Sequence, residues 1–255
     1  MERREQIAER LERIARNEQL IYNAGVEKGK AEVGESIYDD GMNQGRQDMN
    51  TAMMDAITCN GTKTEYRYAF WGEVWNDELF KPHTVIKPTN FQNGLYRSSI
   101  EYGAYTDLLD FSNCQNLSAA FMYSTVKKLK IIDARSTTSG FNGLSNTFHS
   151  CANLESIDEF YPSSPTSKAA FSNTFLGCSA LTRIIFKSEI WQNGLDLHWS
   201  TNLSRESIES IINALSTITN GTTLTLSQTA KENAFTDEEW ASLIATKPNW
   251  TISLA

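Results

Sequence analysis

The chain has 255 residues, and 40% of them are hydrophobic, so it can bury a sizeable core. Its 31 acidic and 23 basic residues give a formal net charge of -8. That balance argues against a nucleic-acid partner, because nucleic-acid affinity depends on clustered Lys and Arg side chains. The opening residues alternate charged and single apolar positions, and no run reaches the roughly 20 apolar residues of a membrane helix. We therefore expect neither a secretory signal nor membrane insertion.

Residues 1–58 are predicted to form a helical coiled-coil stalk that assembles the protein. Apolar residues at heptad spacing mark its predicted oligomerisation seam: Ile7, Leu11, Ile14 and Ile21. Two to three heptads are marginal alone, so we expect a homo-oligomer, most simply a trimer, that needs help from the rest of the chain or a larger assembly. The alternative is a single amphipathic helix lying on its own domain. Five glycines between residues 25 and 58 interrupt the helix, since each costs about 1 kcal/mol relative to Ala.

Residues 59–103 are predicted to be an aromatic-rich cap. They begin at an Asn60-Gly61 turn, and aromatic residues cluster between Tyr66 and Trp75. A repeat array exposes an apolar end, and an aromatic unit of different sequence is the expected cover for it. The alternative is a sugar-stacking platform made by Tyr66, Tyr68, Trp71 and Trp75.

Residues 104–255 are predicted to be repeats. The stretch LSNTFHSCANLESIDE (144–159) returns as FSNTFLGCSALTRIIF (171–186) after 27 residues, and Ser118 and Phe121 stand one further interval upstream. One strand is expected in each unit: Leu109–Phe111, Ile131–Asp133, Ile157–Asp158, Ile184–Phe186, Leu195–Leu197, Leu224–Leu226 and Ile252–Leu254. Helices are expected after an N-cap at Ser204 and after a capping box that starts at Thr236.

The fold class expected from these patterns is an α/β repeat protein. An N-terminal coiled-coil helix is followed by an aromatic cap and a leucine-rich-repeat solenoid with a parallel sheet, because one strand and one helix or turn recur every 27 to 29 residues. Three of the four cysteines open the pattern Cys-x-x-Leu, at Cys114, Cys151 and Cys178. We expect the cysteines to be small, buried and reduced rather than paired in disulfides.

The segments SNTF, CANLESID and CSALTRI resemble the leucine-rich repeats of the BspA-like family, and NLSRESIESIINALSTITNGTTLTL resembles its closing units. The front half is similar to BspA-like proteins in phages and prophages of gut bacteria, where a charged helix precedes a segment resembling YAFWGEVWNDELFKP. Two departures concern the first repeat. Ser124 stands where Cys151 and Cys178 stand later, and Leu129 lies two residues further from Phe121 than the later leucines lie from their phenylalanines.

No spacing of nucleophile, base or metal ligands supports an enzyme, a metal site or a cofactor. His149 falls inside a repeat and is predicted to be a partly buried structural residue. Paired acids such as Asp158-Glu159 leave a glycan hydrolase as a minor alternative, but the cluster that starts at Asp237 fits a helix N-terminus better.

The resemblance and the absence of catalytic spacing together favour a binding protein. We expect a tail-associated structural protein of a phage, located in the virion after synthesis in the bacterial cytoplasm. Its partners would be copies of itself, other phage tail or baseplate proteins, and a bacterial surface protein or glycan. The candidate contact residues lie near the later strands: Trp191, His198 and Trp199. The alternative is a non-enzymatic scaffold that binds other phage or bacterial proteins.

Overall fold

The computed structural model describes residues 74–75, 85–100, 107–138, 143–162, 171–191, 194–217 and 222–255. All of them belong to one compact unit, Met53–Ala255. The predicted stalk lies outside the described residues, together with its seam of Ile7, Leu11, Ile14 and Ile21. The described part is an α/β protein with small parallel sheets.

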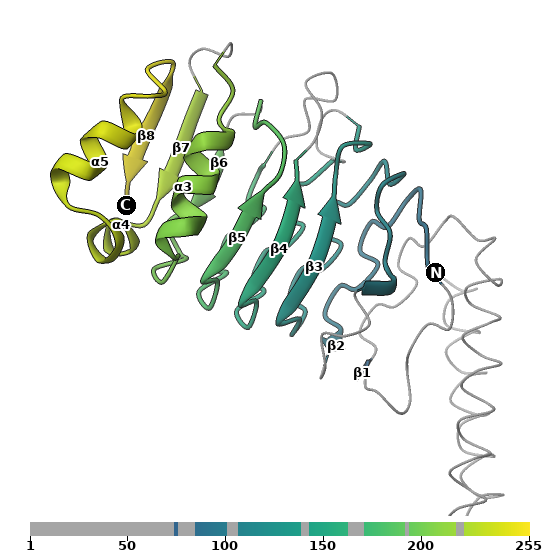
Figure 1. Cartoon of the computed structure of the whole chain (residues 1–255). Helices are drawn as coiled ribbons and strands as arrows, with labels where there is room; N and C mark the ends of the chain where they lie inside the picture. Colours follow the sequence, from purple (N-terminus) through teal and green to yellow (C-terminus); the bar gives the residue numbers. More distant parts are fainter. Residues whose placement is uncertain are drawn as a thin grey trace, which may run out of the picture. The chain divides into compact units, whose positions relative to one another are not determined.

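Six of the strands form two three-stranded parallel sheets that follow each other along the chain (Figure 1). The first contains β3 (Lys128–Asp133), β4 (Ser156–Tyr161) and β5 (Arg183–Phe186); the second contains β6 (Leu195–Leu197), β7 (Thr222–Leu226) and β8 (Trp250–Leu254). A short parallel pair joins β1 (Val74–Trp75) to β2 (Ser99–Ile100). Six of the seven expected strands are confirmed. The seventh, Leu109–Phe111, is wrong as a strand, because only Leu109 pairs, in an isolated bridge with Ile86.

Strand register follows the repeat spacing that the sequence predicts. In the second sheet Leu195 pairs with Leu224 and Leu224 with Ile252, which are the expected intervals. In the first sheet Leu129 pairs with Ile157, so Leu129 is a strand residue and not the counterpart of Leu154. The buried Val126 lies between Ser124 and β3 instead. The first repeat is therefore one residue shorter at this point, which explains the unusual position of Leu129.

Three helices accompany the second sheet: α3 (Arg205–Ala214), α4 (Gln228–Ala234) and α5 (Asp237–Ile244). The Ser204 hydroxyl accepts from the Ser207 amide as the predicted N-cap of α3, and Thr236 and Glu239 form the predicted capping box of α5. The sequence reading missed α4. Its residues, QTAKENA, carry no apolar periodicity, and only Ala230 and Lys231 are buried.

A column of phenylalanine rings forms the centre of the first repeats. Phe121 stacks on Phe148 and Phe148 on Phe175, each pair with centroids 5.4 Å apart. All three rings are buried. Cys114, Cys151 and Cys178 are buried and belong to no disulfide, as expected, whereas Cys59 lies outside the described residues.

Five successive turns share one hydrogen bond, which also occurs elsewhere, for example from Cys114 N to Phe111 O, and the repeated motif is plain in only three of the five. In each turn the amide of a small buried residue donates to the carbonyl three positions earlier, at 2.8 to 3.2 Å. We call these residues the small row: Ser98, Ser124, Cys151, Cys178 and Ser200. Hydrogen-bonded stacking therefore begins upstream of residue 104, because the turn around Ser98 bonds the next turn through Leu95 and Arg97.

Candidate binding surface

The residue before each member of the small row faces solvent or lies half-buried at the surface. We call this set the exposed row: Arg97, Tyr123, Ser150, Gly177 and Trp199. One position earlier lies a set of half-buried residues, which we call the flanking row: Tyr96, Met122, His149, Leu176 and His198. The two rows run side by side across the first four turns, because exposed-row amides donate to flanking-row carbonyls of the next turn; Tyr123 N, for example, lies 2.9 Å from His149 O. The fifth turn is joined differently, since the Ser200 hydroxyl donates to the Cys178 carbonyl at 3.1 Å.

Four members of the exposed row share an unusual backbone conformation. Arg97, Tyr123, Ser150 and Gly177 all have positive φ, between 57° and 78°. The first three carry side chains in a conformation that only glycine adopts without cost. Trp199 also precedes a small residue whose amide bonds three positions back, Ser200, but it is not among the residues of positive φ, so the fifth turn has a different backbone path.

Four side chains form a continuous cluster at the N-terminal end of the two rows. The Tyr123 ring is 43% exposed and lies 5.7 Å from the Tyr96 ring and 5.6 Å from the His149 ring, measured between centroids. The guanidinium carbon of Arg97 lies 5.4 Å from the Tyr96 centroid and 5.6 Å from that of Tyr123. This is a cation–π arrangement that leaves the outer edge of the guanidinium accessible.

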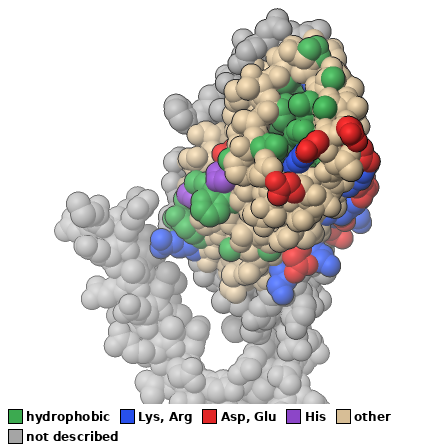
Figure 2. Space-filling model, turned by 90° about the vertical axis from the view of Figure 1, so that its left-hand side faces the viewer, with side chains coloured by type: hydrophobic (Ala, Val, Ile, Leu, Met, Phe, Trp, Pro, Cys, Tyr) green, Lys and Arg blue, Asp and Glu red, His purple; other side chains and the backbone are tan. Residues whose placement is uncertain are grey.

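The other end of the rows carries two of the three residues that the sequence singled out. Trp199 is 48% exposed, and its ring centroid lies 5.1 Å from that of His198. His198 Nδ1 lies 2.7 Å from an oxygen of Asp196, which fixes the imidazole beside the indole. Figure 2 shows histidine and hydrophobic side chains gathered on one side of the molecule, next to Lys or Arg side chains. Trp191 is half-buried and follows the bridge between Ile190 and Leu215.

His149 is the predicted partly buried histidine of the repeats. Its Nδ1 atom is buried and has no hydrogen-bond partner among the described residues. Burial also lowers the pKa of His149, because desolvation disfavours the imidazolium. At neutral pH this side chain is therefore an uncharged part of the cluster.

The outward face of the first sheet is different, because its charges are already paired. Lys130 lies 3.7 Å from Asp107, and Arg183 pairs with both Asp158 and Glu206. Further along, Arg135 bonds the Asp133 carboxylate through two nitrogens and lies over the Tyr161 ring, 4.7 Å from its centroid. A ligand on this face would have to replace existing ion pairs.

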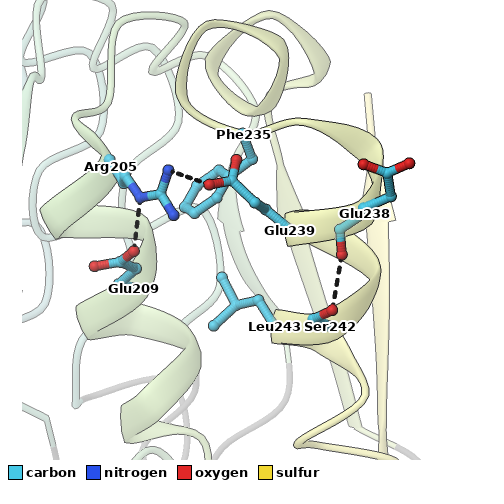
Figure 3. A pocket seen from close by; sticks show the side chains of 7 residues that line it. All are labelled: Arg205, Glu209, Phe235, Glu238, Glu239, Ser242 and Leu243. Atoms are coloured by element: carbon cyan, nitrogen blue, oxygen red, sulfur yellow. Dashed lines mark hydrogen bonds and ion pairs between the residues drawn. The ribbon is translucent and has the colours of Figure 1, made fainter.

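A cleft of about 440 Å³ lies between α3 and α5 (Figure 3). Its arginine, Arg205, donates to Glu209 and Glu239 and lies 4.6 Å from the centroid of the Phe235 ring. These contacts join α3 to α5 across one repeat. The charged side chains that line the cleft thus bond one another in an internal ion-pair network.

No group of three or more His, Cys, Asp or Glu side chains in the described segments could hold a metal ion. Within the same segments, no helix is long and apolar enough to cross a membrane. The His198–Asp196 pair orients an imidazole as in a catalytic triad, but no nucleophile of the described chain bonds its other nitrogen.

Trp199 and His198 were named from the sequence as candidate contacts, whereas Arg97 and Tyr123, which lie in the same two rows, were not. The missing signal was the small row: Ser98 and Ser200 stand where the later repeats have cysteine, and the residue before each of them belongs to the exposed row. The interval from Cys178 to Ser200 is five residues shorter than the repeat, which hid the last turn.

No protein-family model, no curated protein and no solved structure matches this chain.

Proposed function

We propose that this chain is a tail-associated structural protein of a phage or prophage that binds the bacterial surface. Its repeats are leucine-rich repeats of the BspA-like kind, stacked as a solenoid, and its N-terminal segment assembles three copies. The observation that carries this proposal is the exposed row, where accessible aromatic and cationic side chains stand on a stack of hydrogen-bonded turns. A stack of this kind holds its surface residues at fixed spacing, which suits the recognition of an extended partner.

The N-terminal segment supports the proposal through avidity. Three tethered copies raise the effective concentration of each binding surface and strengthen a weak contact by about 10² or more. The predicted seam of Ile7, Leu11, Ile14 and Ile21 supplies the apolar positions for that assembly.

The experiment is binding of the labelled full-length protein to a panel of gut bacteria. We expect the wild type to bind some strains, and the double variant Tyr123→Ala/Trp199→Ala to bind them at least 10-fold more weakly. The matched control is Tyr161→Ala/Ile131→Ala on the outward face of the first sheet, which should bind as the wild type does. Absence of binding to every strain, or equal loss in both double variants, contradicts the proposal.

Light scattering on the full-length protein tests the assembly separately. We expect the mass of a trimer for the wild type and a lower mass for Leu11→Asp/Ile14→Asp, because charges in the seam repel. A monomeric wild type would remove the avidity argument.

One observation favours the alternative of a non-enzymatic scaffold. Tyr, Trp and Arg are the residues that dominate binding energy at protein interfaces, and all three stand in the exposed row. Capture of a purified tail or baseplate protein through Tyr123 and Trp199, without any binding to cells, would select this function.

A further inference from the structure

The side chains of the exposed row are large and exposed toward its ends and small in its middle. Tyr123 and Trp199 are both more than 40% exposed, whereas Ser150 and Gly177 between them present one hydroxymethyl group and no side chain. Neighbouring parallel repeats lie about 4.8 Å apart, so the two hydrogen-bonded steps from Tyr123 to Gly177 cover about 10 Å. Trp199 lies in the turn that follows, which is joined to the turn of Gly177 by the bond from Ser200 Oγ to Cys178 O. The result is a shallow saddle with an aromatic side chain at each end.

The floor of the saddle is kept low by close packing. A Cβ atom added to Gly177 would lie 3.3 Å from the Cα atom of Ser150, and Gly177 has a φ of +78°. Any side chain at position 177 would therefore be strained and would also raise the floor.

Arg97 is the described arginine without a carboxylate partner. Arg135, Arg183 and Arg205 each bond at least one Asp or Glu side chain. No described carboxylate lies within 4.0 Å of the Arg97 guanidinium, which instead rests against the rings of Tyr96 and Tyr123. A guanidinium binds carboxylate or phosphate with two parallel hydrogen bonds, and this one is available to do so.

The charge of the surrounding surface agrees with that reading. The ten positions of the exposed and flanking rows contain no Asp or Glu, although the chain has 31 acidic residues and a net charge of -8. The nearest acid named in the contacts of these rows is Asp196, which is engaged by His198. An anion thus meets an unpaired cation at one end of the saddle in an otherwise acidic protein.

We propose that the exposed row binds an anionic glycan, with sugar rings stacked on Tyr123 and Trp199, the chain crossing the Ser150–Gly177 floor, and a carboxylate or phosphate group bonded to Arg97. This inference rests on the proposed function, because the glycan would be part of the bacterial surface that the protein binds. Aromatic rings bury the apolar faces of sugar rings, while the Tyr hydroxyl and the Trp N–H group remain hydrogen-bonded to water.

A folded protein partner fits this surface less well. Protein interfaces have a contiguous apolar core surrounded by a polar rim. Here the centre of the row is Ser150 and Gly177, and the large side chains stand apart at the ends. A linear polymer can cross a low floor and contact both ends, since the repeats present their side chains in a line.

Glycan binding by the full-length protein tests this inference through titration calorimetry. The probes are a hyaluronan octasaccharide for carboxylate, a glucosylated glycerol-phosphate octamer for phosphate, neutral maltooctaose, and an Asp/Glu octapeptide. We expect one of the two anionic glycans to bind at least 10-fold tighter than maltooctaose and the peptide, which also identifies the acid group. Arg97→Gln should remove that preference, and Tyr123→Ala or Trp199→Ala should lower the affinity about 10-fold or more.

Matched variants on the outward face of the first sheet are the controls. Arg183→Gln removes an arginine that already has carboxylate partners, and Tyr161→Ala removes a tyrosine under Arg135. Both should bind the glycan as the wild type does, and circular dichroism should show that all five variants fold. Equal affinity for charged and neutral glycans, tighter binding of the acidic peptide, or full binding by Arg97→Gln would overturn the inference.

Competition on cells separates this inference from the proposed function. If the anionic glycan displaces the protein from bacteria, both stand. If bacteria bind the protein but neither anionic glycan competes, the ligand class is wrong and surface binding remains. If an anionic glycan binds the protein through Arg97 but no bacterial strain binds the protein, the ligand class stands and the proposed function fails.

Discussion

The Sγ atom of Cys151 lies 2.9 Å from the carbonyl oxygen of Phe121 in the preceding turn, and donates to it. Cys178 bonds Phe148 in the same way at 3.1 Å. Each thiol thus ties its turn to the one before, at a place where water does not reach. Burial raises the pKa of Cys151 to about 12, and that of Cys178 well above its ordinary 9.0.

These raised pKa values predict that alkaline solution destabilises the fold. Unfolded thiols ionise near pH 9 while the folded ones keep their protons, so the native state binds more protons and the free energy of unfolding falls as pH rises. The contribution of Cys151 is complete below pH 9 and is lost between about pH 9 and pH 12. The contribution of Cys178 has the same sign and also declines above pH 9, because its folded pKa is raised as well. Urea unfolding at pH 8 and at pH 10.5 measures this loss.

The control for the thiols is Cys151→Ser/Cys178→Ser. Serine already stands in the small row at Ser124 and Ser200, so the double variant should fold. Its stability should decline less between the two pH values than that of the wild type. An identical decline in both proteins would show that other groups cause it.

Removing one ring from the phenylalanine column should be costly. Phe148→Ala deletes a fully buried side chain that stacks on Phe121 and Phe175, and we expect a loss of about 3–5 kcal/mol in the free energy of unfolding. Ile131→Ala is the control, because that side chain is 45% exposed and its loss should cost no more than about 0.5 kcal/mol. Chemical denaturation compares the two, and equal costs would rule out a central role for the column.

Two glycines separate conformational cost from crowding. Gly177 and Gly194 have φ values of +78° and +81°, but only Gly177 has a neighbour against which an added Cβ would press. Gly194→Ala should cost about 1 kcal/mol for its backbone conformation alone. Gly177→Ala should cost about 1 kcal/mol more, because Ser150 must move. Thermal unfolding that ranks the two variants equally would contradict the close packing.

The sequence predicted most of the second half of the fold because local signals agree there. Apolar residues at helical spacing and the Ser204 N-cap predicted α3, and the capping box predicted α5. Polar α4 carries no such pattern and is held by its Ser227 cap and the packing of Ala230. Leu109 and Phe111 were expected in a strand because they follow the apolar pattern of the other units. Both side chains are buried, yet only one backbone bridge forms there, at Leu109.

The exposed row was harder to predict because its alignment depends on backbone conformation. Exposed residues such as Arg97 and Tyr123 have no sequence in common, and they align only through the turn that precedes Ser98 and Ser124. Both positions have positive φ, a conformation that neither an arginine nor a tyrosine residue predicts from the sequence. Trp199 was named from the sequence because it is an aromatic residue beside one of the later strands, and the structure shows that it is exposed.

The capping box of α5 predicts a dependence of stability on acid. The Thr236 amide donates to Glu239, and this bond, followed by the Arg205 side chain, lowers the pKa of Glu239 below its ordinary 4.5. A carboxylate with a lowered pKa stabilises the fold above pH 4.5, and that stabilisation disappears as pH falls through the folded value. Glu239→Gln keeps an acceptor for the Thr236 amide but removes the charge, so its stability should change less between pH 6 and pH 3.

Two further variants define the scale of that effect. Thr236→Ala removes the side-chain cap and should cost about 1 kcal/mol at pH 7. Glu238→Gln neutralises the neighbouring carboxylate on the same turn, which makes no bond to Thr236 in the capping box, and should keep the wild-type response to acid. If Glu238→Gln flattens the response as much as Glu239→Gln, the effect belongs to the general charge of the α5 N-terminus and not to the capping contact, since a helix N-terminus favours any nearby negative charge.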